Sequence, residues 1–204
     1  MIYKFNNPTV PNIYLNIGHL IDHFMMLIFA KAAYDSGRYF GLNYDEMIIY
    51  GTLGMVLFGA SAPLAGFLSD KYGRMPLMIA YHFGIGISAI LASLSTSTYQ
   101  LAMCLALIGM FASIYHPVGI AMLLQRPGVV GLRMGINGVW GNMGIAVAPI
   151  VTGVLLYYGD WRLTFMVPGI ICIIFGILFF ASITSNEDSN SKENNQKKNS
   201  LEFA

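Results

Sequence analysis

The chain has few charged residues and few cysteines. Asp, Glu, Lys and Arg make up only 10% of its 204 residues, whereas a soluble domain carries about 25%. Its 2 cysteines, Cys104 and Cys172, fall inside apolar segments and neither stands at metal-ligand spacing, so the cysteines support neither a disulfide framework nor a metal site. The net charge of +1 gives no indication of a nucleic-acid partner. The soluble and disulfide-rich classes are therefore excluded.

Apolar residues are abundant instead, at 56% of the chain. A helix that crosses a hydrocarbon core of about 30 Å needs roughly 20 apolar residues. Backbone polar groups in lipid must be paired internally, and the period-two alternation of membrane strands is missing, so the long apolar runs are predicted to be helices. The runs are 12–33, 48–68, 76–95, 99–123, 134–157 and 163–183. The predicted fold class is an all-α membrane protein, a bundle of six transmembrane helices.

Positive residues gather on one side of this predicted bundle. Lys and Arg near helix ends set membrane topology, with the positive side in the cytoplasm. If six helices alternate, one side holds Lys4, Lys71, Arg74, Arg126, Arg133, Lys192, Lys197 and Lys198, and the opposite loops hold only Arg38 and Arg162. The distribution predicts a multi-pass protein of the plasma (inner) membrane with both termini in the cytoplasm.

The pattern divides the chain into three segments. Residues 1–11 are predicted to be a cytoplasmic N-terminus and residues 12–183 the six-helix bundle. Residues 184–204 are rich in Asn, Ser, Lys and Glu, which predicts a disordered polar tail or linker in the cytoplasm. The first run differs from a secretory signal because it is longer, contains Asp22 and Lys31, and lacks a small-residue cleavage site. We expect it to remain in the mature protein.

The most specific motif lies between the second and third runs. Gly66 is followed, after three residues, by Asp70, Lys71, one further residue, Gly73 and Arg74. The motif resembles the loop between the second and third helices of major facilitator superfamily (MFS) transporters, although a methionine replaces the usual basic residue after Arg74. The resemblance covers about residues 12–183 and implies the N-terminal six-helix half of such a transporter, built from 3+3 inverted repeats.

In that family the loop acts as a conformational latch whose Asp and Arg positions contact neighbouring helices of both halves. The resemblance implies this role for Asp70 and Arg74. A simpler alternative is a surface anchor, in which Lys71 and Arg74 contact anionic headgroups. A recurring glycine spacing agrees with the inverted repeat, although chance is the alternative in a glycine-rich chain. The two sets are Gly51, Gly54 and Gly66, and Gly138, Gly141 and Gly153.

The first predicted helix carries polar residues on one face. His19, Asp22, His23 and Met26 stand at i, i+3, i+4 and i+7, along one helical stripe. An acidic residue inside a membrane usually faces a cavity and marks a substrate or proton path. Asp22 is therefore the leading candidate for a protonatable or substrate-contacting residue, with His19 and His23 as partners. An interhelical ion pair is the alternative, and we predict no metal site because the stripe offers three ligands and no fourth.

His116 is a further candidate for the same substrate or proton pathway. It precedes Pro117 deep in the fourth predicted helix, where a proline frees a backbone carbonyl and makes room for a ligand. This His-Pro pair is similar to one in fosmidomycin-resistance-like members of the family. The alternative is a histidine that donates to the backbone of a neighbouring helix.

The fifth predicted helix contains Gly144, Pro149 and Gly153. Their spacing resembles the antiporter motif of the family, in which glycines and a Gly-Pro pair make a smooth, bent helix. Ala148 and Thr152 replace two of the motif's glycines. The motif favours export, and close helix packing through small residues is the structural alternative.

These features predict transport of a small solute by alternating access, coupled to protons, with export as the implied direction. We predict no enzyme activity and no cofactor, because no nucleophile set, metal motif or phosphate-binding loop is present in the sequence. The expected partners are the solute, protons, the lipid bilayer, and either a second copy or a separate six-helix half. The alternative is a non-transporting truncated fragment or an assembly subunit of a membrane complex.

Overall fold

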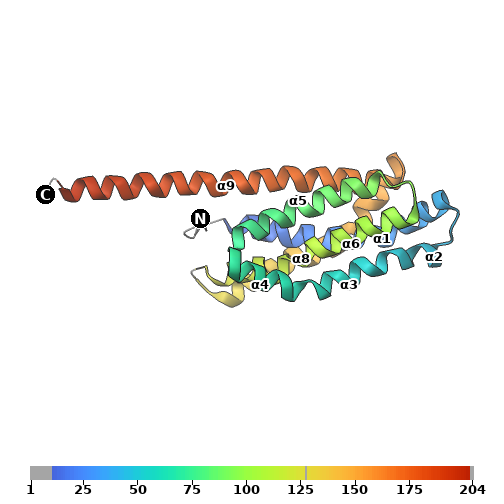
Figure 1. The fold of residues 1–204 in the computed structure, drawn as a ribbon, viewed down its shortest axis with the longest axis horizontal. Helices are drawn as coiled ribbons and strands as arrows, with labels where there is room; N and C mark the ends of the chain where they lie inside the picture. Colours follow the sequence, from blue (N-terminus) through green and yellow to red (C-terminus); the bar gives the residue numbers. More distant parts are fainter. Residues whose placement is uncertain (1–10, 127, 203–204) are drawn as a thin grey trace.

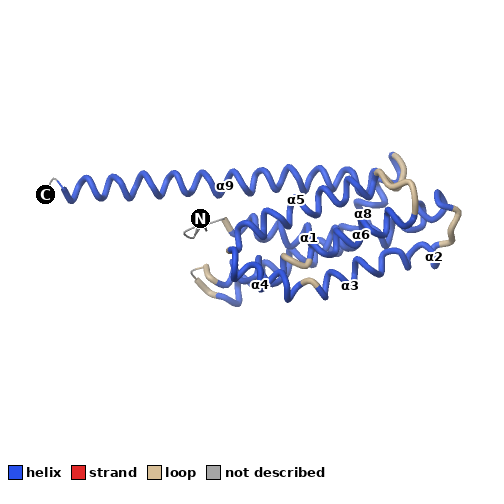
Figure 2. The backbone as a smooth tube through the Cα atoms, viewed as in Figure 1, coloured by secondary structure: helices blue, strands red, loops and turns tan. Residues whose placement is uncertain are grey.

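The computed structural model describes residues 11–126 and 128–202 as helices joined by short loops (Figures 1 and 2). Two short elements are not α-helical: η1 is a 3₁₀ turn and η2 is a π-helical turn. The elements are α1 (Asn12–Phe40), α2 (Tyr44–Ile48), η1 (Ile49–Gly51), α3 (Thr52–Ala60), α4 (Ala62–Tyr72), α5 (Arg74–Ser93), α6 (Thr98–Ala112), η2 (Tyr115–Gly119), α7 (Ile120–Leu124), α8 (Val130–Tyr158) and α9 (Leu163–Glu202).

The elements form six membrane-spanning units. Five stretches are long and apolar enough to cross a bilayer, and they are α1, α5, the α6–η2–α7 segment, α8 and the apolar part of α9. The sixth unit is the bent pair Tyr44–Ala60 and Ala62–Tyr72, whose axes differ by 44°. Pro63 in the first turn of α4 explains this bend. Proline has no N–H for an α-helical hydrogen bond, and its ring clashes with a carbonyl of the preceding turn. The predicted six-helix membrane bundle is confirmed.

Local sequence signals set the helix ends. Gly41 closes α1 in the left-handed conformation at φ 73°. Gly73 separates α4 from α5 at φ 96°, a backbone conformation that glycine adopts without strain. Ser97 caps α6 and accepts a hydrogen bond from the backbone N–H of Gln100 at 3.3 Å. These ends separate the helices into antiparallel neighbours that pack side by side.

Glycines allow the closest helix contacts. Gly109 of α6 lies against the backbone of Gly54 in α3, where an added Cβ would collide with a carbonyl oxygen. A Cβ on Gly86 of α5 would lie 2.8 Å from the carbonyl oxygen of Gly169 in α9. Small residues at such interfaces let membrane helices approach closely, and packing of this kind drives their association where lipid is as apolar as the side chains.

The glycines of the two recurring sets differ in how closely a neighbouring helix approaches them. Gly54 and Gly141 each face a neighbouring helix, whereas an added Cβ on Gly138 or Gly153 would meet nothing within 4 Å. Helix α8 is correspondingly buried on one stripe only. Its buried residues are Asn137, Gly141, Gly144, Ala148 and Thr152. The remaining residues of the helix are half-buried or exposed, and the exposed ones include several large apolar side chains.

The segment after the bundle belongs to the last helix. Helix α9 continues to Glu202 and extends past the other helices as one long rod (Figure 1). Residues 184–202 contain no proline or glycine, so the sequence holds no residue that stops a helix there. The expected cytoplasmic N-terminus, 1–11, lies outside the described residues except for Pro11.

Candidate functional site

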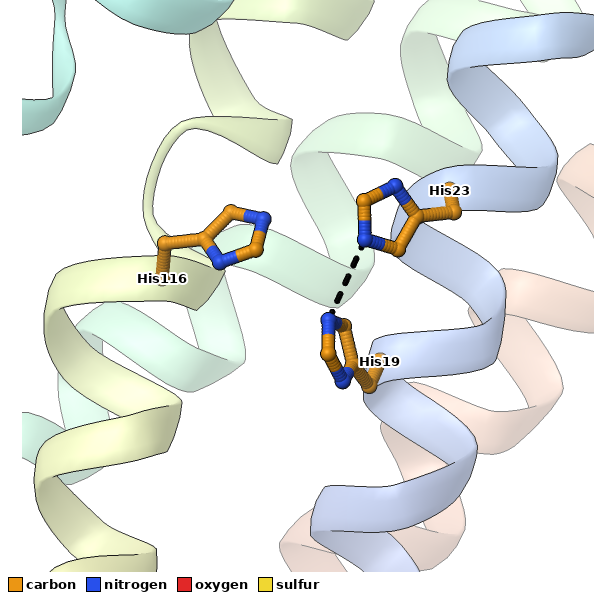
Figure 3. A group of neighbouring side chains, drawn as sticks. All are labelled: His19, His23 and His116. Atoms are coloured by element: carbon orange, nitrogen blue, oxygen red, sulfur yellow. Dashed lines mark hydrogen bonds between the residues drawn. The ribbon is translucent and has the colours of Figure 1, made fainter. Parts of the chain in front are cut away.

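Three histidines from two separate helical segments meet inside the bundle. His19 and His23 come from successive turns of α1, and His116 comes from η2 (Figure 3). One ligand atom of each ring lies within 4.8 Å of the others. The Nε2 atoms of His19 and His23 are 3.1 Å apart and share a hydrogen bond. The structure therefore places three of the predicted pathway residues in one cluster.

Asp22 completes this polar cluster. Its carboxylate Oδ2 lies 3.4 Å from Nε2 of His116, and its side chain is 0% exposed whereas that of His116 is 37% exposed. Among the described residues, neither carboxylate oxygen receives a hydrogen bond. A buried carboxylate without donors is costly unless a cation or a proton neutralises it. His116 is the nearest group that can carry the positive charge.

A hydrogen-bonded network fixes the base of the cluster. The backbone carbonyl of Asn137 in α8 accepts a hydrogen bond from Nδ1 of His19 at 2.8 Å. The Asn137 amide nitrogen Nδ2 donates to Asn16 Oδ1 at 3.0 Å and to the Tyr115 hydroxyl at 2.9 Å. The Tyr115 hydroxyl donates in turn to the carbonyl of Leu15 at 2.6 Å. This network holds α1, η2 and α8 together at the site.

The sequence interpretation missed three members of this network, namely Asn16, Tyr115 and Asn137. The signal that could have found Asn16 and Asn137 is the one that found Asp22, because any polar side chain inside an apolar run faces the bundle interior. Asn16 also stands three residues before His19, on the same stripe of α1. Tyr115 carries no comparable signal, since tyrosine occurs at many lipid-facing and buried positions.

The π-helical turn explains why His116 reaches the cluster. Pro117 has no N–H to continue an α-helical ladder, and the backbone widens over Tyr115–Gly119. Pro117 also lies beside Gly66 of α4, whose added Cβ would be 3.7 Å from the proline Cβ. The turn thus orients His116 toward α1 while it packs against the second membrane-spanning unit.

An apolar pocket of about 190 Å³ lies next to the polar cluster along α1. Met26, three residues after His23, belongs to its wall. Helix α3 and helix α6 supply other wall residues, including Gly54 and Leu105. The arrangement places a polar cluster and an apolar surface on neighbouring turns of α1, which is typical of small-molecule sites that combine apolar lining with few polar groups.

Comparison with known proteins identifies the family. A family model described as Major Facilitator Superfamily matches residues 9–203. The chain belongs to the Major Facilitator Superfamily. It is a multi-pass integral membrane protein of a transporter family and not an enzyme.

Curated relatives within the superfamily are only distantly similar. The nitrate/nitrite transporter NrtP of Nostoc punctiforme is 26% identical over 185 residues, 85% of this chain and 37% of the relative. The puromycin resistance protein pur8 of Streptomyces alboniger is 31% identical over 108 residues, 52% of this chain and 22% of the relative. A probable hexose phosphate transport protein of Chlamydia muridarum is 27% identical over 152 residues, 73% of this chain and 33% of the relative. The matches to these relatives span roughly a fifth to two fifths of their own length.

The MFS-like motif lies at one end of the bundle, where it is mostly helical: Asp70 and Lys71 are in the last turn of α4, Gly73 separates the helices and Arg74 begins α5. Arg74 donates from Nη1 to the carbonyl of Ala121 in α7 at 3.3 Å, so it ties two membrane-spanning units together. Asp70 is exposed, and Lys71 lies 5.1 Å from the centre of the Tyr72 ring. The motif's latch role across two halves stays a prediction.

The antiporter-like residues of α8 divide between two faces. Gly144 packs on the backbone of Leu20 in α1, and Pro149 lies inside the helix. Gly153 faces open space. Close packing on α1 therefore accounts for Gly144 but not for Gly153. The role of this motif in export stays a prediction, as does the resemblance to fosmidomycin-resistance-like members.

Proposed function

We propose that this chain is one six-helix half of a transporter that moves a small solute across the membrane by alternating access and couples this movement to protons. The observation that carries the proposal is the fully buried Asp22 carboxylate beside His116, at 3.4 Å. Family membership supports the transport activity, and the pocket next to the cluster supplies a place for the solute.

The Asp22–His116 pair provides a physical basis for proton coupling. With one proton between them the pair is neutral overall, either as an ion pair or as two uncharged groups. Uptake of a second proton makes the pair cationic, and loss of the first makes it anionic. A net charge in a membrane interior is costly, so each protonation state favours a different exposure of the site to water. Proton binding is thereby linked to the conformational equilibrium.

A second half is proposed to cover the open face of α8. Val139, Met143, Ile150 and Val154 are exposed along this helix, together with the uncrowded Gly138 and Gly153. Such a surface suits either lipid or close helix packing. The partner is a second copy of this chain or a separate six-helix half, and Asp70 and Arg74 would then reach it as the latch. We also propose export, from the antiporter-like Gly144, Pro149 and Gly153.

A crosslinking experiment tests the pairing. Single cysteines at Gly153 on α8 and, as a matched control, at the exposed Ile87 on α5 are introduced after replacement of Cys104 and Cys172. We expect rapid disulfide dimers from Gly153→Cys in native membranes and slow ones from Ile87→Cys. Equal rates at the two positions would contradict pairing of two copies through α8 and leave a separate six-helix half as the partner.

The same cysteine approach tests membrane orientation. We propose that residues 12–183 form the bundle in the plasma (inner) membrane, with 1–11 and 184–204 in the cytoplasm. A cysteine at Ser191 should react with a membrane-impermeant maleimide only in inside-out vesicles, and a cysteine at Ser97, between α5 and α6, only in right-side-out vesicles. The reverse pattern would contradict the proposed orientation.

Transport itself is tested with the purified chain in liposomes, alone and after crosslinking into dimers. Nitrate, a hexose phosphate and puromycin serve as first solutes because relatives bear their names. We expect saturable flux that grows with an imposed proton gradient of one direction. Flux that is saturable but independent of the gradient would leave transport standing and contradict proton coupling. Folded, dimeric protein without flux for a broad solute panel favours the fragment or assembly-subunit alternative.

A further inference from the structure

The arrangement of three imidazoles around one point has a use beyond proton transfer. We propose that His19, His23 and His116 form a binding site for a divalent transition-metal cation of the Zn²⁺ type. The proposal goes beyond the transport function, because metal binding needs only the three rings and not a solute or a second half. It also departs from the sequence expectation of no metal site, which counted only the ligands of the first helix.

The geometry of the three rings suits tetrahedral coordination. Zn²⁺ binds imidazole nitrogens at about 2.0–2.1 Å, which places two tetrahedral ligand atoms roughly 3.3 Å apart. The Nε2 atoms of His19 and His23 are already 3.1 Å apart. The remaining separations do not exceed 4.8 Å, and all three rings point toward a common space (Figure 3). Because the hydrogen bond to His19 is donated by Nε2 of His23, metal binding moves that proton to Nδ1 of His23, and side-chain rotations then bring the three nitrogens to one ion.

Neighbouring groups orient two of the three rings. A backbone carbonyl only accepts hydrogen bonds, so the 2.8 Å contact with the Asn137 oxygen requires a proton on Nδ1 of His19. Nε2 of a neutral His19 then presents its lone pair to the centre of the cluster. Asp22 Oδ2 lies 3.4 Å from Nε2 of His116, where its negative charge favours a cation beside that ring.

Asp22 supplies an independent indication that the cluster favours a cation. Its side chain is 0% exposed, and within residues 11–126 and 128–202 neither carboxylate oxygen accepts a hydrogen bond. A buried carboxylate of this kind is stabilised by a nearby positive charge. A divalent cation among the three rings would provide that charge without requiring a proton on His116. The cluster therefore combines nitrogen ligands with an anion that favours cation binding.

The ligand set selects the class of ion. Imidazole nitrogens suit Zn²⁺, Cu²⁺, Ni²⁺ and Co²⁺, whereas Mg²⁺ and Ca²⁺ prefer oxygen ligands. Three protein ligands leave the fourth tetrahedral position for water or another molecule. The His116 side chain is 37% exposed, so an ion has access to the cluster. We therefore expect Zn²⁺ and Co²⁺ to bind and Mg²⁺ not to compete.

The test measures metal binding by the purified full chain, prepared with an affinity tag that contains no histidine. Co²⁺ reports tetrahedral nitrogen coordination through its visible d–d absorption, and Zn²⁺ is titrated in competition. We expect one ion per chain. Each of His19→Gln, His23→Gln and His116→Gln should weaken binding at least about 100-fold, because loss of a second-shell group alone costs 10–100-fold.

His82 provides the matched control because it is the fourth histidine of the chain and lies outside the cluster. His82→Gln should leave the affinity and the Co²⁺ spectrum unchanged. The variant His23→Cys should retain binding and add a thiolate-to-cobalt charge-transfer band, which a merely structural histidine would not produce. If a glutamine variant folds poorly, the new band of His23→Cys still shows whether position 23 binds the ion.

Three results would overturn the proposal. They are folded wild-type protein that binds neither Zn²⁺ nor Co²⁺, binding that persists in the triple glutamine variant, and binding that is lost only in His82→Gln. Solute flux plays no part in these measurements. A failed metal titration therefore leaves the transport proposal standing, and absent flux leaves the metal proposal standing.

Discussion

Two parts of the bundle place histidine in different surroundings. Beside α1, the rings of His19, His23 and His116 contact one another and a buried carboxylate. Beside α9, His82 of α5 lies 5.1 and 5.2 Å from the rings of Phe175 and Phe179, and neither of its nitrogens has a hydrogen-bond partner in the described part of the chain. The same side chain thus lies in a polar cluster in one place and among aromatic rings in the other.

The largest expected effect comes from Asp22→Asn. Asparagine keeps the shape of the side chain but can neither ionise nor take up a proton, so the coupling pair with His116 is lost. We expect gradient-driven solute flux to fall to the level of protein-free liposomes, while gradient-independent counterflow persists. In His82→Gln, outside the polar cluster, the gradient-driven flux should be retained.

Folding is checked by size-exclusion chromatography and circular dichroism for both variants. If Asp22→Asn retained its gradient-driven flux, the polar cluster would not be the proton site. If His82→Gln lost flux in folded protein, the contrast between the two surroundings would fail, because a histidine outside the polar cluster would then be essential to transport.

A smaller effect is expected from crowding the contact between α5 and α9. A Cβ on Gly86 would lie 2.8 Å from the Gly169 carbonyl oxygen and equally close to the side chain of Ile173. Overpacking of this kind costs about 1–3 kcal/mol. We expect Gly86→Ala to lower the free energy of unfolding in mixed detergent micelles by that amount.

Gly153→Ala is the matched control for this crowding, since a Cβ there meets nothing within 4 Å. Alanine is the better helix former, so this variant should be unchanged or more stable by up to about 1 kcal/mol. Equal destabilisation by the two substitutions would show that the α5–α9 contact is looser than the glycine packing indicates.

The fold was predictable because its signals are local. Six apolar runs and a glycine-rich turn determine the number of helices and the loop at Gly73, whatever the tertiary packing. The polar stripe of α1 was predictable for the same reason, since His19, Asp22 and His23 share one face through the helical period alone. Hydropathy does not report on helix formation outside the bundle, where the polar segment 184–202 continues α9.

The contacts between helices were not predictable from such signals. Proline marked the fourth helix as distorted, but the π-helical turn that aims His116 at Asp22 depends on its packing against α4. The role of Asn137 depends on its backbone carbonyl, which every residue possesses and no sequence pattern distinguishes. The metal-site geometry is therefore a property of three segments in contact, namely α1, η2 and α8.

The smallest expected effect is a difference in stability between two variants that each remove a buried tyrosine hydroxyl. Both hydroxyls donate to carbonyls of α1. Tyr81, on α5, donates only to Gly18 at 2.7 Å, whereas the Tyr115 hydroxyl donates to Leu15 at 2.6 Å and accepts from Asn137. Loss of one membrane hydrogen bond costs about 0.6 kcal/mol on average, so Tyr81→Phe should cost about that much. Tyr115→Phe should cost about 1–2 kcal/mol, because it also leaves a buried amide donor of Asn137 with one partner fewer. Unfolding in mixed micelles measures the free energy of unfolding of both variants. Equal losses would mean that the contact of Tyr115 with Asn137 contributes nothing beyond the single hydrogen bond to α1.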